Sequence, residues 1–144
     1  MSELMLMCLI AGRRAAIPAG EVRSVIEIEA ITPIPGTPAF IAGLTALRSQ
    51  ALTVIDSPVA LGFESSGDVV GQRAAVIQRD GHLYALVVDE AYDVGEARSQ
   101  VTEVKGGFGG NWKQVAKGMV ETDQGPALLV DIDALIAAPM ASAA

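Results

Sequence analysis

Two stretches of the chain, one in each half, carry the same pattern of residues. In residues 43–56 a Gly-Leu pair precedes an apolar run that ends in Asp56. In residues 118–131, at an offset of 75, a Gly-Met pair precedes a similar run that ends in Asp131. Upstream, residues 11–17 correspond to residues 80–86 at an offset of 69. Two offsets near half the chain length predict one small structural unit, duplicated and since diverged.

The two units are expected to form one domain over residues 1–144. Apolar residues make up 51% of the chain and charged residues 19%, which is enough for a packed core. A lone unit of about 60 residues buries only about 60% of its unfolded surface, against about 70% for 150 residues. The units should therefore pack on each other. We place them at about residues 3–66 and 70–138.

Short apolar segments bounded by Gly, Pro or charged residues predict an all-β fold. Their length and β-branched content are typical of strands. Five short strands per unit favour a small barrel, which removes exposed sheet edges. Arg79-Asp80-Gly81-His82 is a favourable hairpin turn, because Gly readily takes a positive φ. The expected strands are 4–10, 15–17, 22–28, 41–47 and 51–55, then 74–78, 83–88, 91–95, 117–121 and 127–130.

The end of the chain predicts a short helix. Ile132 to Ala138 has helical character, with Asp131 as its N-cap and Pro139 ending it. Residues 140–144 are expected to be frayed. Residues 31–38 carry three prolines and should be extended without forming a central strand. Residues 106–110 are glycine-rich, but they lack the Gly-Lys-Ser/Thr ending of a phosphate-binding loop.

Charge and hydropathy exclude several classes of protein. Seventeen acidic and ten basic residues give a net charge of -7, which lacks the cationic footprint of a nucleic-acid binder. The mean hydropathy of +0.40 is high. However, no apolar stretch reaches the ~20 residues of a membrane-spanning helix. Residues 4–11 are apolar but short, and we interpret them as a buried strand. We expect a cytoplasmic protein, and a single cysteine fits this location.

The chain lacks the parts of a catalytic site, so we expect a protein without enzymatic activity. His82 is the only histidine and lies at a predicted turn, and Cys8 lies within an apolar strand. A nucleophile, a base and an orienting group are hard to assemble from these two residues. Asp56 and Asp131 end equivalent strands, where an Asp typically caps the following segment. We expect no metal and no cofactor, because no cluster of ligands has the required spacing.

Four motifs follow one another over nearly the whole chain. Residues 37–56 have a proline-led entry, an apolar strand, Arg48 at a hairpin, and a second apolar strand ending in Asp56. Residues 22–26 precede this run, and residues 86–94 and 117–136 follow it. In this order and spacing the motifs resemble the CheW family of bacterial chemotaxis coupling proteins.

The resemblance implies two intertwined five-stranded SH3-like barrels packed together, with a short C-terminal helix. It also implies a non-enzymatic adaptor or scaffold. Such adaptors link the cytoplasmic tip of a methyl-accepting chemoreceptor to the regulatory domain of a CheA-type histidine kinase. The alternative that we keep is a small-barrel module that binds a ligand or a protein outside chemotaxis.

The resemblance also implies protein-binding residues. These are Arg48, whose guanidinium offers five donors, and Val22, Gly43 and Leu47, which flank the family's groove between the barrels. Each of the three is equally consistent with ordinary barrel packing, and Arg48 with an ordinary charged hairpin residue.

The chain departs from the family at several motif positions. The N-[LI]-R-G turn reads Ala46-Leu47-Arg48-Ser49, and the following P-[VI]-[IV]-D-L segment reads Thr53-Val54-Ile55-Asp56-Ser57. Ser49 replaces the glycine of the N-[LI]-R-G turn, which is unfavourable where φ is positive. Ser24 stands where an acidic partner for Arg48 is expected, and Glu21 or Glu27 is the proposed substitute. These departures leave the expected fold unchanged and favour a divergent coupling protein.

Overall fold

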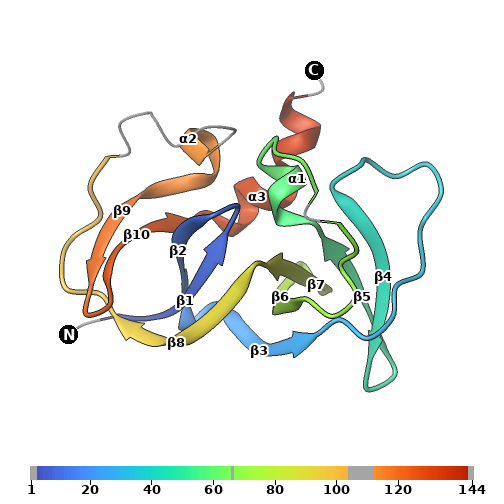
Figure 1. Cartoon of the computed structure of the whole chain (residues 1–144), viewed down its shortest axis with the longest axis horizontal. Helices are drawn as coiled ribbons and strands as arrows, with labels where there is room; N and C mark the ends of the chain where they lie inside the picture. Colours follow the sequence, from blue (N-terminus) through green and yellow to red (C-terminus); the bar gives the residue numbers. More distant parts are fainter. Residues whose placement is uncertain (1–2, 66, 104–111, 143–144) are drawn as a thin grey trace.

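The fold is described from a computed structural model, which covers residues 3–65, 67–103 and 112–142. The glycine-rich residues 106–110 lie outside this part of the chain. All ten predicted strands are present within one or two residues of their expected bounds (Figure 1). They are β1 (Leu4–Ile10), β2 (Arg13–Pro18), β3 (Val22–Glu27), β4 (Ile41–Leu47), β5 (Gln50–Ile55), β6 (Arg73–Arg79), β7 (His82–Val88), β8 (Glu90–Glu96), β9 (Ala116–Thr122) and β10 (Gly125–Val130). The helical segments are η1 (Ala19–Glu21), α1 (Ser57–Ala60), α2 (Trp112–Val115) and α3 (Ile132–Ser142).

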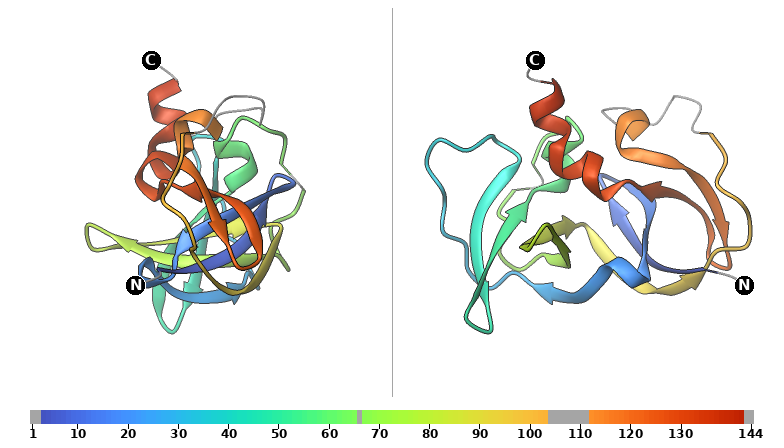
Figure 2. Two further views of the ribbon diagram at one scale, coloured as in Figure 1. Left: turned by 90° about the vertical axis from the view of Figure 1, so that its left-hand side faces the viewer. Right: turned by 180° about the vertical axis from the view of Figure 1, so that it is seen from behind.

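The strands form two five-stranded sheets that lie side by side, with α3 between them (Figures 1 and 2). We call the sheet with order β8-β1-β2-β10-β9 the β1 sheet, and the sheet with order β3-β6-β7-β5-β4 the β6 sheet. Advancing every strand by five converts one order into the other. The duplication inferred from the 69- and 75-residue offsets is therefore visible in the topology.

The two sheets do not coincide with the approximate bounds 3–66 and 70–138. The β1 sheet combines β1 and β2 of the first half with β8, β9 and β10 of the second half. The β6 sheet combines β3, β4 and β5 with β6 and β7. The physical reason is that β2 and β7 each join the other half through a parallel pairing, β2 with β10 and β7 with β5. Two parallel strands must be joined by a long connection. Each parallel pair therefore brings together strands that are not consecutive in the sequence.

The core explains why the strands show so little alternation of apolar and polar residues. Along β6, Ala75 and Ile77 face a central cluster between the sheets, whereas Ala74 and Val76 face a second cluster inside the β6 sheet. β1 behaves in the same way, with its two faces contributing to the central cluster and to a third cluster inside the β1 sheet. Because both faces are buried, both must be apolar.

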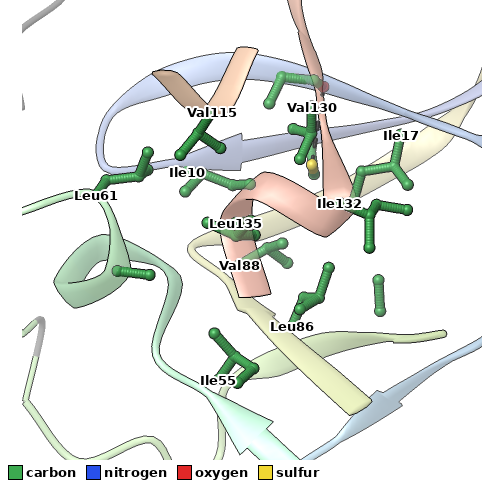
Figure 3. Close-up of a cluster of buried hydrophobic side chains, with 14 of the residues drawn as sticks. Ile10, Ile17, Ile55, Leu61, Leu86, Val88, Val115, Val130, Ile132 and Leu135 are labelled. Carbon is green, nitrogen blue, oxygen red and sulfur yellow. Dashed lines mark hydrogen bonds between the residues drawn. The ribbon is translucent and has the colours of Figure 1, made fainter. Parts of the chain in front are cut away.

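The central cluster joins the two halves of the molecule (Figure 3). Figure 3 shows side chains from both sheets and from α3 converging on one another, including Ile10, Ile55, Leu86 and Leu135, each with at most 1% of its surface exposed. At about 25 cal/mol per Å² of apolar surface removed from water, such contacts are the main source of stability. The sheets therefore share one core rather than touching through a polar interface.

The repeated glycines Gly43 and Gly118 occupy equivalent close contacts. Their φ angles are 147° and 154°. A Cβ atom at Gly43 would lie 2.4 Å from the carbonyl oxygen of Thr32, and one at Gly118 would lie 2.2 Å from that of Thr102. At both places a segment outside the sheet crosses the strand and pairs with the next residue, Thr32 with Leu44 and Thr102 with Met119. Only glycine fits such a crossing.

The ends of the helices differ from the sequence-based expectation. Asp131 caps α3 as expected, since its Oδ1 accepts a hydrogen bond from the Ala134 N–H at 3.2 Å. However, α3 continues to Ser142. The prediction that Pro139 ends the helix was therefore wrong, and so was the expectation that residues 140–142 are frayed. A proline usually kinks or ends a helix, because it lacks a backbone N–H and its ring crowds the preceding turn, yet α3 runs past Pro139.

Asp56, the repeat counterpart of Asp131, has a different role. Its carboxylate makes no cap bond to α1. Instead its Oδ2 accepts a hydrogen bond of 2.8 Å from the Ser65 hydroxyl, which ties the loop after α1 back to the end of β5. The Asp56 N–H and the Asp131 N–H still make equivalent bonds, to the carbonyls of Phe40 and Val115. The backbone repeat is thus retained while the side-chain function has diverged.

Neither half of the chain is expected to fold alone. Residues 1–70 lack the second-half partners of β1, β2, β3 and β5, and residues 71–144 lack the first-half partners of β6, β7, β8 and β10. Each fragment should give a poorly dispersed amide NMR spectrum, and an equimolar mixture should recover dispersion. A well-dispersed, stable spectrum from either fragment as a monomer contradicts this expectation.

Gly43→Ala should destabilise the protein by about 2–3 kcal/mol, because it combines a strained φ with a backbone clash. Gly81→Ala is the matched control, since Gly81 also has a positive φ but has open space around its Cβ position. The control should cost only about 1 kcal/mol. Chemical denaturation of both variants measures the difference, and equal losses would show that the crossing at Thr32 yields easily.

Candidate functional site

Arg48 lies at the tip of the β4–β5 hairpin, in a two-residue turn. Leu47 pairs with Gln50, so Arg48 and Ser49 alone form the turn. Their φ angles are 51° and 69°. Two consecutive positive φ angles define the type I′ turn, which matches the twist of a hairpin. Ser49 therefore adopts the conformation for which glycine is suited, as the sequence comparison predicted.

The same turn occurs at two other hairpins of the molecule. Ala11-Gly12 joins β1 to β2, and Asp80-Gly81 joins β6 to β7, each with two positive φ angles. Both have glycine at the second position. Of these three turns, only the Arg48-Ser49 turn has a residue with a side chain at its second position. Ser49 therefore carries conformational strain that Gly12 and Gly81 avoid.

A groove of about 390 Å³ opens beside this turn, in the β6 sheet. It lies between the hairpin tip and β3, one of the two edge strands of the sheet. Its floor comes from β6 and β7, which connect the two sides. The lining residues are Arg23, Ser24, Val25, Ile26, Leu47, Arg48, Gln50, Val76 and Leu83. We call this the hairpin groove.

The hairpin groove combines an apolar floor with two guanidinium groups. Ile26, Leu47 and Leu83 pack against the buried cluster inside the β6 sheet, so the floor is continuous with the core. Arg23 and Arg48 flank it. The Arg23 Nη1 donates a hydrogen bond to the Gln78 Oε1, which holds that side chain along β6. Within residues 3–65, 67–103 and 112–142, Arg48 is exposed and makes no hydrogen bond or ion pair.

The proposed replacement partner of Arg48 is engaged elsewhere. Glu21 Oε2 lies 2.5 Å from the Nη2 of Arg79, whose Nε also donates to the Asp133 Oδ1 at 2.8 Å. These bonds, with that to Glu21 contributing most, raise the pKa of Arg79. Arg79, at the end of β6, thus connects η1, through Glu21, with α3, through Asp133. Among the described residues Glu27 also forms no ion pair with Arg48, so neither substitution expected from the sequence occurs.

The structure brings together two of the four residues singled out in the sequence. Leu47 and Arg48 both line the hairpin groove. Val22 lies at the start of β3, one residue before the groove begins, and packs partly against the central cluster. Gly43 is buried in the middle of β4 beneath Thr32. Gly43 can therefore shape the strand that carries the groove, but it presents no side chain to a partner.

Sequence reasoning missed the β3 side of the groove and a second exposed surface. Val25 lines the groove and is 37% exposed. At an offset of 69, Val94 on β8 is 49% exposed, and Tyr92 and Leu4 are exposed nearby on β8 and β1. Figures 1 and 2 show β3 and β8 along the same lower side of the molecule. Extending the 69-residue repeat to Val25 and Val94 would have indicated paired edge positions.

The remaining chemical candidates have structural explanations. His82 is exposed beside its turn, as expected. Burial raises the pKa of the Cys8 thiol to about 12, and its Sγ contacts the Ala15 carbonyl at 3.7 Å. Such a thiol is a poor nucleophile. Over residues 3–65, 67–103 and 112–142, no three His, Cys, Asp or Glu side chains are grouped to hold a metal ion. In the same residues, no helix is both long and apolar enough to cross a membrane.

Comparison with known proteins gives one matching family and a similar solved structure. A family model described as the CheW-like domain matches residues 4–140. The solved structure of the scaffolding protein TtCheW from Thermoanaerobacter tengcongensis superposes with a TM-score of 0.80 at 22% sequence identity. The match covers 94% of this chain and 88% of that protein. No curated protein sequence is similar enough to count as a relative.

Ser49→Gly should stabilise the protein or leave its stability unchanged. Glycine relieves the positive φ of the turn, and we expect a gain of about 0.5–1 kcal/mol, partly offset by the greater freedom of glycine in the unfolded chain. Gly81→Ser is the reverse control at the equivalent turn position and should cost about 1 kcal/mol. Urea denaturation reports both changes. A loss above about 1 kcal/mol for Ser49→Gly would show that the serine side chain supports the turn.

Proposed function

Because this chain belongs to the CheW-like domain family, we propose that it is a non-enzymatic adaptor of bacterial chemotaxis signal transduction. In this role it links the cytoplasmic tip of a chemoreceptor to the regulatory domain of a CheA-type histidine kinase in the cytoplasm. Family membership supports the general role. The identity of the two partners is the part that we propose.

The unpaired guanidinium of Arg48 is the observation that carries this proposal. The side chain stands at the rim of a groove whose floor reaches the core. Within the fold an exposed ion pair at this position would contribute only ~0–1 kcal/mol, and no such pair is formed among the described residues. In a desolvated interface an arginine often contributes about 2 kcal/mol or more. We therefore expect Arg48 to contribute little to folding stability and more to the affinity for a partner.

An adaptor needs two contact surfaces, and we propose two candidates among the described residues. The hairpin groove belongs to the β6 sheet, whereas Tyr92 and Val94 are exposed on β8, an edge strand of the β1 sheet, and Leu4 is exposed on the neighbouring β1. The Tyr92 hydroxyl donates to the Glu90 carboxylate at 2.6 Å, which raises the tyrosine pKa and orients its ring. An edge strand offers unpaired backbone groups to a partner, and we propose this edge as the second contact surface. One surface for each partner fits the proposed role.

A second candidate is a protein-binding module outside chemotaxis. The observation in its favour is Ser24, which lines the hairpin groove where the family resemblance leads us to expect a carboxylate. The charge of the groove is therefore more positive than expected, and its preferred partner can differ. An acidic partner that binds the groove while chemoreceptor and kinase fragments do not would favour this second candidate.

Arg48→Ala should weaken binding while leaving stability nearly unchanged. We expect at least a tenfold loss of affinity for the receptor tip or the kinase regulatory domain, equivalent to ~1.4 kcal/mol. Arg48→Lys should recover part of it, because an ammonium group lacks the planar fork of donors. Isothermal titration calorimetry and thermal melts on the same preparations separate the two properties.

Arg73→Ala is the matched control for this experiment. Arg73 is an exposed arginine of the same sheet, at the start of β6 and outside the groove. Its replacement should leave both affinities unchanged. If Arg48→Ala unfolds the protein, the residue is structural. If Arg48→Ala and Arg73→Ala behave alike, the hairpin groove is not the contact surface.

A further inference from the structure

In the β1 sheet, the end of β8 is joined to the β9–β10 hairpin. Ala97 pairs with Thr122, and the Asp123 N–H donates a hydrogen bond to the Glu96 carbonyl at 3.1 Å. The side chain of Asp123 completes the contact, because its Oδ1 accepts a hydrogen bond of 2.9 Å from the Glu96 N–H. These bonds connect the two edge strands of the sheet, so its edges are closed against each other at this point.

The equivalent place in the β6 sheet is open. The 69- and 75-residue offsets relate Glu96 to Glu27 and Asp123 to Arg48. Among the residues that the structure describes, no hydrogen bond or strand pairing joins β3 to the β4–β5 hairpin. The replacement explains part of the difference, since a guanidinium carries only donors and cannot accept the Glu27 N–H as a carboxylate would. The hairpin groove occupies this opening.

The outer edge of β3 presents backbone groups to this opening. Ile28 faces the other way, because its N–H donates to the Gln72 carbonyl and its carbonyl accepts from the Gly71 N–H, on the β6 side. Residues of an antiparallel strand alternate between bonding to their partner strand and pointing away from it. The N–H and C=O groups of Val25 and Glu27 therefore point toward the groove. Unpaired groups on an edge strand can pair with a strand of another chain.

The side chains around this edge define what an added strand must carry. Arg23 and Arg48 place two positive charges at the groove. Farther along the same opening, Glu29 lines a second hollow of about 390 Å³ beside β4. The apolar floor of the groove includes Leu47 and Leu83. A complementary segment is extended, with an acidic residue toward the arginines, an apolar residue over the floor, and no acidic residue at the Glu29 end.

We propose that the hairpin groove binds an extended acidic segment of a partner protein, which adds as a strand to the edge of β3. Its backbone pairs with Val25 and Glu27. Its carboxylate accepts hydrogen bonds from Arg48, so that the partner supplies the acceptor that Asp123 supplies in the β1 sheet. An apolar side chain two residues away lies on the same face and covers Leu83. This binding mode deepens the proposed function and rests on it for the identity of the partner, although the pairing itself is tested without that partner.

A peptide of sequence Lys-Thr-Val-Thr-Asp-Thr, capped at both ends, is the probe, because it places lysine, valine and aspartate on one face of an extended strand. Its titration into isotope-labelled protein should shift the amide NMR signals of Val25 and Glu27 and slow their exchange with solvent. The same peptide with asparagine in place of aspartate should bind about tenfold more weakly, since it loses the charge-assisted bond to Arg48. No binding up to the solubility limit of the probe, equal affinity of the two peptides, or unchanged Val25 and Glu27 signals would each overturn the proposal.

Val25→Pro tests the backbone pairing. Proline removes the Val25 N–H, which faces away from β6, so no hydrogen bond within the sheet is lost. We expect the affinity for the probe to fall at least about tenfold. Val25→Thr is the matched control, because it keeps the N–H and the shape of the side chain, and it should change the affinity by less than about twofold. Equal losses in the two variants would assign the binding to side-chain contacts and contradict strand addition.

If Val25→Pro does not fold, the wild-type protein answers the same question. Copies of the probe methylated on alternate backbone nitrogens lose the hydrogen bonds on one side of the strand but keep every side chain. The copy methylated on the side that faces β3 should bind at least about tenfold more weakly, and the copy methylated on the other side should bind as the probe does. Equal affinities of the two copies contradict strand addition.

Competition with the partners separates this inference from the proposed function. Excess probe should displace whichever fragment, receptor tip or kinase regulatory domain, binds in an Arg48-dependent way. If a fragment binds in this way and the probe does not displace it, strand addition is wrong for the partner while the proposed function stands. If the probe binds but neither fragment does, the proposed function fails while the binding of an extended acidic segment stands.

Discussion

The whole structure depends on the burial of both faces of the strands in the middle of each sheet. Alternate residues of β1, β6 and β7 enter either the central cluster or the cluster within their own sheet. A strand with two buried faces cannot lie at the surface and cannot be completed by its own half alone. The exchange of strands between the halves follows, since it surrounds these strands with apolar partners. The shared groove and the dependence of each half on the other follow in turn.

The duplicated backbone has been kept most strictly where covalent geometry leaves no choice. Gly43 and Gly118 retain the same φ and the same backbone contact, because any Cβ atom at these positions would overlap a carbonyl group. Side-chain roles have diverged far more. Asp131 caps a helix, whereas Asp56 closes a loop through Ser65. Steric exclusion thus preserves the fold, while the hydrogen-bonding side chains at equivalent positions remain available for new uses.

The hairpin groove shows how an adaptor surface can be built from very few specialised residues. The type I′ turn directs Arg48 away from the core, and the strain at Ser49 is the cost of having a side chain there. The floor needs no residues of its own, because it is the open end of the cluster within the β6 sheet. Arg79 supports the β3 side at a distance, by holding Glu21 and Asp133 together.

The local features of this protein follow from patterns within short stretches of the chain. Apolar runs and turn residues placed all ten strands, the repeat indicated duplication, and Asp131 was recognised as a cap because its hydrogen bond lies within the helix that it begins. The ordered motifs also indicated the family, and with it the turn conformation at Ser49. These features depend on residues close together in the chain, so a pattern in the sequence is sufficient to reveal them.

The choice of strands in each sheet, and of side chains in the hairpin groove, depends on long-range packing. An apolar run shows that a strand is buried but not against what, so the bounds 3–66 and 70–138 did not correspond to the sheets. Val25, Val76 and Leu83 gave no sequence signal of their own, because their place beside Arg48 results from pairings between distant strands. The ion pair between Glu21 and Arg79 likewise results from segments that are distant in the sequence, so the sequence did not indicate it. Contacts made across the two halves depend on the packing of the whole chain, which no local pattern records.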